Sequence, residues 1–99
     1  MRELIPSPAT EDDILAAALW YEARSAGLGM DFIRAADAAL AAVARSPHQY
    51  PVVHRKVRRV LMRRFPYAAY FVTDDRTVQV IACMHVRRDP RRWKARVNR

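Results

Sequence analysis

The spacing of apolar side chains predicts two helices in the first half of the chain. Ser7 followed by Pro8 is typical of an N-cap with proline in the first helical turn. One apolar face then repeats at helical spacing, formed by Ile14, Ala17, Ala18 and Tyr21. A second helix is expected from about Met30 to Arg45, with an apolar face formed by Phe32, Ala36, Ala39, Leu40 and Val43. Gly27-Leu28-Gly29 predicts a turn between them, so the two helices form a hairpin.

The second half changes to the alternation that is typical of strands. Prolines 47 and 51 end the hairpin, because proline cannot continue a helix. Strands are expected over residues 2–6, 57–65, 68–73 and 77–85, with a turn at 74–76. In the 57–65 run, Phe65 is expected on the face opposite Met62. In the last run one face is expected to meet the helices, and it is formed by Val78, Val80, Ala82 and Met84.

This order of elements predicts an α+β fold in one domain over residues 1–99. It has a short N-terminal strand, a helical hairpin and a three-stranded antiparallel meander, with the helices packed on one face of the sheet. Asp89-Pro90 predicts a short C-terminal helical turn by the same capping pattern as Ser7-Pro8. The longest apolar stretch, residues 35–44, is too short to span a membrane, and the amino terminus lacks the apolar core of a secretory signal. With a single cysteine there is no intrachain disulfide, and a cytoplasmic protein is expected.

Positive charge is concentrated in the second half of the sequence. Residues 54–99 carry 14 Lys and Arg against 3 Asp and Glu, a local charge of +11. Residues 1–53 carry 4 against 7, a charge of −3, and the two halves sum to +8. Arginine outnumbers lysine 16 to 2, and arginine is the better residue for bidentate contacts with carboxylates and phosphates. We therefore expect a functional basic surface that meets a negatively charged partner, although solvated surface charge is the alternative.

Few residue types in this chain could carry chemistry. His48 and His54 flank a proline-rich loop and are expected to be exposed, whereas His85 ends a strand and could act as a general base or fix the following loop. Cys83 is interpreted as a buried small hydrophobe, and no cofactor or metal site is expected. The carboxylates of residues 11–13 are interpreted as surface groups that complement the helix dipole. Trp93 could stack on a nucleobase, but we favour an anchor that packs the terminal turn onto the sheet.

Several of these features together resemble the RelE/ParE toxin superfamily. They are the two helices after a short strand, the segment Arg63-Arg64-Phe65-Pro66-Tyr67 with Tyr70 beyond it, and the segment from His85 to Pro90 with Trp93. The resemblance spans about residues 7–96 and is closest to the ParE-like, plasmid-stabilisation branch. It implies the toxin of a type II toxin–antitoxin system, silenced by a cognate acidic antitoxin. ParE-like members are associated with poisoning DNA gyrase, and RelE-like members with metal-independent mRNA cleavage on the ribosome.

The RelE pattern of catalytic residues is incomplete in this sequence. Arg87 matches its C-terminal arginine, but its central-strand arginine falls on Tyr67 and its C-terminal tyrosine on Trp93. An indole N–H cannot exchange protons as a phenol does. The resemblance therefore favours a gyrase-binding toxin without chemistry of its own. The alternatives are a ribosome-dependent endoribonuclease, with His85, Arg87 and Arg88 as candidate catalytic residues, or a generic basic nucleic-acid-binding module.

The residues expected to contact the target or the antitoxin come from the basic half of the chain. They are Arg59, Arg63, Arg64, Tyr67, Arg87, Arg88, Arg91, Arg92 and Trp93.

Overall fold

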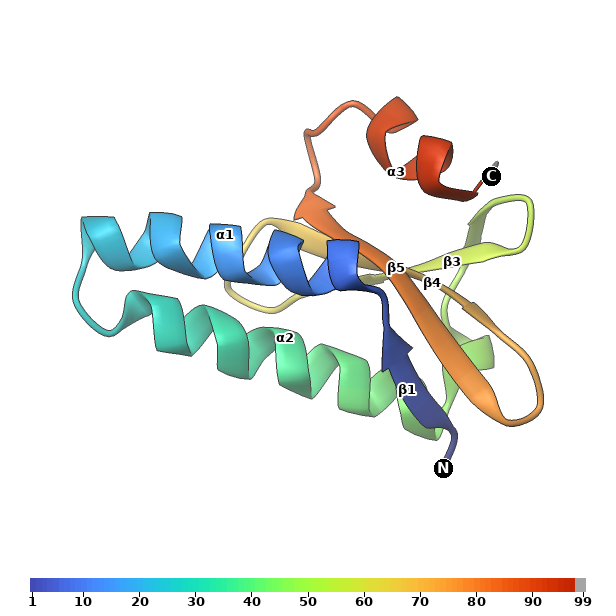
Figure 1. Cartoon of the computed structure of the whole chain (residues 1–99). Coiled ribbons are helices and arrows are strands. Elements are labelled where there is room, and N and C mark those ends of the chain that lie inside the picture. The colour runs from blue at the N-terminus through green and yellow to red at the C-terminus, as the bar shows by residue number, and fades with distance from the viewer. Residues whose placement is uncertain (98–99) are drawn as a thin grey trace.

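The computed structural model describes residues 1–97, and Arg99, which was counted in the charge above, lies outside them. Figure 1 shows a sheet flanked by helices. The elements in chain order are β1 (Glu3–Pro6), α1 (Pro8–Arg24), α2 (Leu28–Arg45), the 3-10 turn η1 (Pro47–Gln49), β2 (Val52–His54), β3 (Val57–Leu61), β4 (Tyr67–Thr73), β5 (Thr77–His85) and α3 (Arg91–Val97). The five strands lie in the order β1-β5-β4-β3-β2, with β1 parallel to β5 and the other pairs antiparallel. The α+β fold class is confirmed, and β2 is a strand that the sequence pattern did not predict.

The start of α1 is fixed by the predicted cap and by one further bond. Ser7 accepts a hydrogen bond from the backbone N–H of Thr10 at 3.1 Å, and Pro8 occupies the first turn. Thr10 is fully buried, and its hydroxyl donates to the carbonyl of Val80 at 2.8 Å. A cap at the surface and a hydrogen bond in the core therefore fasten the same helix end to β5.

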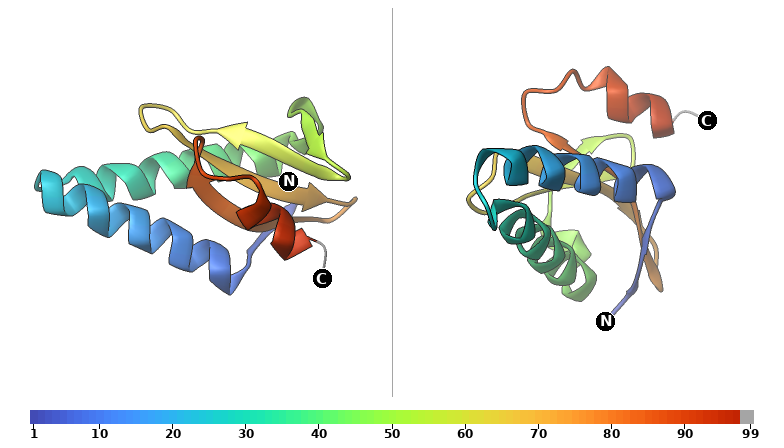
Figure 2. Two further views of the ribbon diagram at one scale, coloured as in Figure 1. Left: turned by 90° about the horizontal axis from the view of Figure 1, so that it is seen from above. Right: turned by 60° about the vertical axis from the view of Figure 1, so that its left-hand side comes forward.

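The connection between α1 and α2 depends on a carboxylate, on Gly27 in the turn and on Gly29 in the first turn of α2. Glu22 accepts backbone N–H bonds from Gly27 and Gly29 at 3.0–3.1 Å, which lowers the pKa of its carboxyl group. Gly27 has φ 90°, in the left-handed region that favours glycine. At Gly29 a Cβ atom would lie 2.6 Å from the carbonyl oxygen of Ala18, so only glycine permits this approach of the helices. Figure 2 shows the resulting hairpin from two further sides.

The two faces of the sheet carry different helices. Leu40 and Val43 of α2 pack against side chains of β3, β4 and β5, among them Phe71 and Val80. On the opposite face Trp93 of α3 packs over a second set of strand residues, formed by Val57, Ala68, Tyr70, Ala82 and Met84. The helical hairpin thus covers one face, and the short C-terminal helix covers the other.

A β-bulge in β5 overturns the predicted face of that strand. Tyr70 pairs with Ala82 while the next residue, Phe71, pairs with Val80, so Ile81 is an extra residue. Val78 and Val80 face the helical hairpin as expected, but the bulge turns Ala82 and Met84 toward α3. It also turns Cys83 toward the hairpin. Simple alternation cannot reveal such an insertion.

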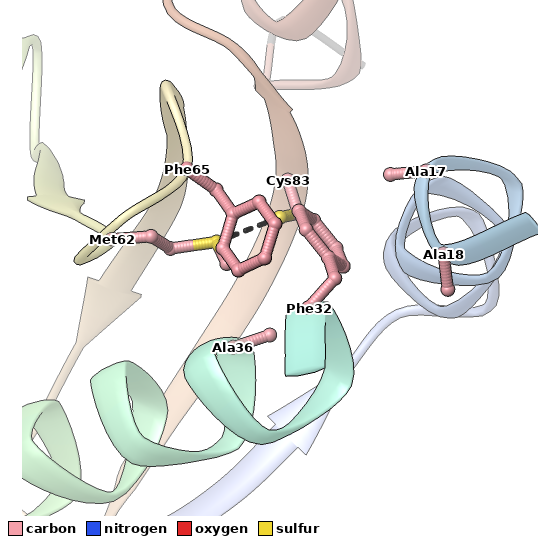
Figure 3. Close-up of a cluster of buried hydrophobic side chains, with 7 residues drawn as sticks. All are labelled: Ala17, Ala18, Phe32, Ala36, Met62, Phe65 and Cys83. Atoms are coloured by element: carbon pink, nitrogen blue, oxygen red, sulfur yellow. Dashed lines mark hydrogen bonds between the residues drawn. The ribbon is translucent and has the colours of Figure 1, made fainter. Parts of the chain in front are cut away.

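Phe65 lies in the core beside the hairpin and not in a strand. β3 ends at Leu61, and the chain bends before β4 begins at Tyr67. The Phe65 ring contacts Tyr21 at 4.8 Å and Phe32 at 5.2 Å between ring centroids. Figure 3 shows Phe65 and Met62 in the same buried cluster, so the expectation that they lie on opposite faces was wrong.

Cys83 is a buried hydrophobe, as its sequence context indicated. Its side chain is 3% exposed, and its Sγ lies 3.9 Å from the Sδ of Met62 (Figure 3). Burial, with a smaller contribution from Asp13, raises the pKa of the thiol to about 12. The thiol therefore stays protonated at neutral pH, which makes it a poor nucleophile.

Candidate functional site

Two arginine-bearing loops meet at one end of the sheet. The loop between β3 and β4 carries Arg63 and Arg64, and the loop after β5 carries Arg87 and Arg88. The backbone N–H of Val86 donates to the carbonyl of Pro66 at 2.9 Å, which joins the two loops directly. This bond joins two arginine-bearing segments through residues that are 20 positions apart in sequence.

Beside these loops lies a hollow of about 1030 Å³ between α1, the end of β5 and α3. We call it the arginine groove. Its cationic rim consists of Arg87, Arg88 and Arg92, which form no ion pair within residues 1–97. Most of the remaining lining is apolar or aromatic and is formed by Ala16, Ala17, Trp20, Tyr21, Pro66, Tyr67, Cys83 and Met84. Three carboxylates also line it, and two of them are already paired, Asp13 with Arg96 and Asp89 with Arg91; the third is Asp12. An apolar trough with unpaired guanidinium groups along its rim suits an acidic, partly apolar ligand.

Not all residues that the sequence nominated lie in this groove. Tyr67, His85, Arg87, Arg88 and Arg92 line it. Arg63 and Arg64 lie on the adjoining loop, outside its lining. Arg59 lies in β3 opposite Tyr70 and also does not line it.

Arg91 and Arg64 already have carboxylate neighbours. Arg91 forms a bidentate pair with Asp89 at 2.6 and 2.9 Å, which lowers the pKa of Asp89 and also braces the start of α3. Arg64 lies 3.7 Å from Asp31 in a looser, exposed pair. The rim arginines Arg87, Arg88 and Arg92 are thus the cations most available to a ligand.

Arg64 has an unusual backbone conformation. Its φ is 70°, in the left-handed region, which is uncommon for residues other than glycine, asparagine and aspartate. Its side chain is 64% exposed, and its guanidinium lies 5.4 Å from the centroid of the Phe65 ring. Strained residues of this kind concentrate at binding and active sites. The strained residue here is an arginine in the loop that leads into Phe65 and Pro66.

Asp13 holds the C-terminal helix, a role that sequence reasoning missed. Its carboxylate accepts two hydrogen bonds from Arg96 at 2.7 and 3.0 Å and one from the backbone N–H of Cys83 at 3.0 Å. Arg96 also donates to the carbonyl of Ile81, the bulge residue, at 3.0 Å. Interpreting Asp13 as a dipole-complementing surface group was therefore wrong, whereas Glu11 and Asp12 are exposed as expected. The partners lie 70 and 83 residues away, so no local pattern could indicate the contact.

Trp93 is the anchor that the sequence favoured. It is 5% exposed and stacks on Tyr70 with ring centroids 4.3 Å apart and an interplanar angle of 17°. Its other neighbour is His54, whose ring lies edge to face at 5.9 Å. The expectation that His54 is exposed was therefore wrong, while His48 is exposed as predicted. A buried Trp93 is not free to stack on a nucleobase.

His85 and Tyr67 lie together where β5 leads into the arginine loop. Their ring centroids are 5.4 Å apart, and Nδ1 of His85 accepts a hydrogen bond from the backbone N–H of Arg87 at 3.0 Å. This bond fixes the start of the loop, which was one of the two roles considered for His85. Burial raises the pKa of the Tyr67 phenol, so it remains protonated at neutral pH.

The described residues offer no ready metal centre and no membrane span. Within residues 1–97, no group of three or more His, Cys, Asp or Glu side chains is placed to hold an ion. Over the same residues, no helix has both the length and the apolar content required to cross a bilayer. The groove is lined by carboxylates as well as by arginine, tyrosine and histidine side chains, but within residues 1–97 these carboxylates are not grouped in that way.

Comparison with known proteins finds a likeness in structure and none in sequence. No protein-family model matches the sequence, and no curated protein matches it either. A solved structure of the chromosomal ParDE TA system from P. aeruginosa contains a chain that matches with a TM-score of 0.74. The match covers 86% of this chain and 96% of the other, at 17% sequence identity. The two chains share one fold. Identity this low establishes the architecture, and the function has to be argued from the site.

Proposed function

We propose that this protein is the toxin of a type II toxin–antitoxin pair and that it acts by binding DNA gyrase. The observation that carries the proposal is the ParDE-like fold bearing an apolar groove with three unpaired arginines along its rim. The ParE-like sequence features around Arg63–Tyr67 and His85–Trp93 form the same end of the sheet as this groove.

Binding without catalysis is supported by the side chains in the groove. Cleavage of RNA without a metal needs a base for the 2′-hydroxyl, a cation for the phosphate and an acid for the leaving oxygen. The groove offers cations in Arg87, Arg88 and Arg92, but the aligned acid position is Trp93, which is buried and stacked on Tyr70. Nδ1 of His85 is already engaged by the backbone. The arrangement therefore fits recognition of an acidic protein surface better than proton transfer.

A cognate antitoxin would silence the protein by covering the arginine groove. The groove combines an apolar trough with unpaired guanidinium groups, so it fits a segment with acidic and apolar residues that folds as it binds. We expect the protein to arrest growth when it is expressed alone and to be tolerated when it is expressed with its antitoxin. A neighbouring small gene encoding a DNA-binding half and an acidic half would supply the candidate partner.

A gyrase assay with matched arginine variants tests the proposal. Purified protein should inhibit plasmid supercoiling and trap cleavage complexes, and the antitoxin should relieve both effects. Replacing Arg88 and Arg92 by alanine should weaken inhibition by roughly tenfold or more, because desolvated arginines are frequent hot spots of interfaces. Arg34→Ala is the control, since Arg34 is 74% exposed on α2 and does not line the groove. Untouched gyrase at concentrations that arrest growth would refute gyrase as the target.

A ribosome-dependent endoribonuclease is the second candidate, because His85, Arg87 and Arg88 all line the groove. It predicts position-specific cuts in mRNA on translating ribosomes, and Arg87→Ala should abolish them while the fold is retained. Absence of cuts in cells arrested by the protein would remove this candidate. Steeply salt-dependent binding to free DNA or RNA without growth arrest would instead identify a generic nucleic-acid-binding module.

A further inference from the structure

His54 occupies an unusual position under the C-terminal helix. Within residues 1–97 its Nε2 is the one side-chain nitrogen or oxygen that is buried without a hydrogen-bond partner. The residue ends β2, and Arg55 after it has a left-handed φ of 53°. The backbone turns sharply here and holds the imidazole edge to face against Trp93. Nothing in the proposed function uses this contact.

The surroundings of His54 favour a neutral ring. Two cations face it, Arg55 from the turn between β2 and β3 and Lys94 from α3. Trp93 lies against it, with Tyr70 of β4 stacked behind Trp93. No carboxylate of residues 1–97 lies within ion-pairing distance of the ring. Protonation of His54 would therefore leave a buried N–H donor at Nε2 without an acceptor. It would also place a third positive charge beside those of Arg55 and Lys94.

We propose that His54 is a proton-sensitive latch for α3. While the ring is neutral, it packs against Trp93 and helps to hold the helix on the sheet. Protonation favours the state in which Trp93 leaves the ring and His54 reaches water. Because α3 carries Arg92 on the rim of the arginine groove, acidification loosens one side of that groove. The bonds of Asp13 to Arg96 remain as a second attachment, so the loosening begins at Trp93.

The direction of the pH effect follows from linkage. Burial, followed by the charges of Lys94 and Arg55, lowers the pKa of His54 in the folded protein. The undocked state therefore binds the proton more tightly than the docked state. Docking of α3 is fully stable above the ordinary histidine pKa and weakens as the pH falls through that value toward the depressed one.

The first test uses the unmodified chain and needs no variant. Imidazole resonances followed by NMR should show His54 titrating below the ordinary histidine pKa, together with a change in the Trp93 indole resonance. Hydrogen exchange of α3, corrected for the intrinsic pH dependence, should accelerate about threefold or more across this titration. Titration of His54 at or above the ordinary histidine pKa, or α3 protection that is unchanged while His54 gains its proton, would overturn the proposal.

Matched substitutions then assign the transition. In His54→Phe an aromatic ring is retained without a titrating group, so α3 should keep its protection down to about pH 5. His48→Phe, which removes an exposed histidine away from α3, should leave the wild-type transition intact. Persistence of the transition in His54→Phe would refute the latch. A second readout is the fluorescence emission wavelength of Trp93, measured in a Trp20→Phe background so that Trp93 is the single tryptophan. The wavelength is preferred to the intensity, because a nearby histidine can quench the intensity without any movement of α3.

Discussion

The helices on the two faces of the sheet are attached in different ways. The hairpin of α1 and α2 is held by a broad apolar contact in which Phe32, Val43 and Phe71 are fully buried. α3 has seven residues and is held on the sheet by a few specific contacts, the Trp93 stack and the bonds of Arg96 to Asp13 and to the carbonyl of Ile81. The first attachment depends on the area of apolar surface that is buried, so the hairpin leaves the sheet only when the whole domain unfolds. The second attachment depends on single side chains, so α3 can leave the sheet while the sheet and the helical hairpin stay folded.

The largest effect is expected at Phe32. Phe32→Ala should lower the free energy of unfolding by about 3–5 kcal/mol, because it leaves a cavity between α1, α2 and Phe65. Denaturant unfolding followed by circular dichroism measures it. Met30→Ala, at a side chain that is 52% exposed on the same helix, should change it by less than about 0.5 kcal/mol. Similar losses in the two variants would contradict a contact based on buried area.

Trp93→Ala should undock α3 and leave the sheet and hairpin in place. We expect a loss of about 2–3 kcal/mol, since the cost cannot exceed the free energy that docks this helix. Hydrogen exchange should show loss of protection in residues 91–97 and native protection in β5. Global unfolding of this variant at room temperature would show that α3 is part of the main core.

Asp13→Asn should loosen the same helix from its other end. The change removes the charge that holds Arg96, whose side chain is only 25% exposed, and should cost about 1–2 kcal/mol. Asp12→Asn is the matched control, because Asp12 is exposed and has no hydrogen-bond partner among residues 1–97. Thermal unfolding of the two variants side by side measures the difference. Equal melting temperatures would mean that the Asp13 contacts contribute nothing measurable.

The smallest change in stability is expected at Arg64 and Arg55, the two residues with a left-handed backbone other than glycine among residues 1–97. Arg64→Gly relieves a left-handed backbone and should raise the free energy of unfolding by about 0.5–1 kcal/mol. Arg55→Gly relieves the same strain at φ 53° and should give a similar gain. Only Arg64→Gly should weaken gyrase inhibition, because Arg64 lies on the loop that joins the arginine groove. Loss of inhibition in both variants, or in neither, would contradict a special role for this loop.

Local physics made most of the fold predictable from the sequence. The Ser7-Pro8 cap, the apolar face from Phe32 to Val43 and the glycine turn all depend on neighbours in sequence, and all were confirmed. The bulge at Ile81 was not predicted, because one inserted residue leaves the apolar composition of β5 unchanged. It nevertheless moves the side chains after Ile81 to the opposite face of the sheet. For the candidate site, the arginines drew attention to the two loops, and their role in binding stays a prediction. The role of Asp13 was not, because a carboxylate in a first helical turn has the same sequence signature whether or not an arginine 83 residues later reaches it.

The parallel pairing of β1 with β5 bears on the order in which the chain can fold during its synthesis. Glu3 lies beside Thr77, and Pro6 lies beside Val80. β1 therefore has no neighbour in the sheet until β5 has been synthesised, whereas α1 and α2 can pair before that. Any interruption of translation before residue 77 leaves a hairpin without the strand that connects β1 to the rest of the sheet. The groove and its arginines therefore take shape only after β5, the loop that follows it and α3 have been synthesised.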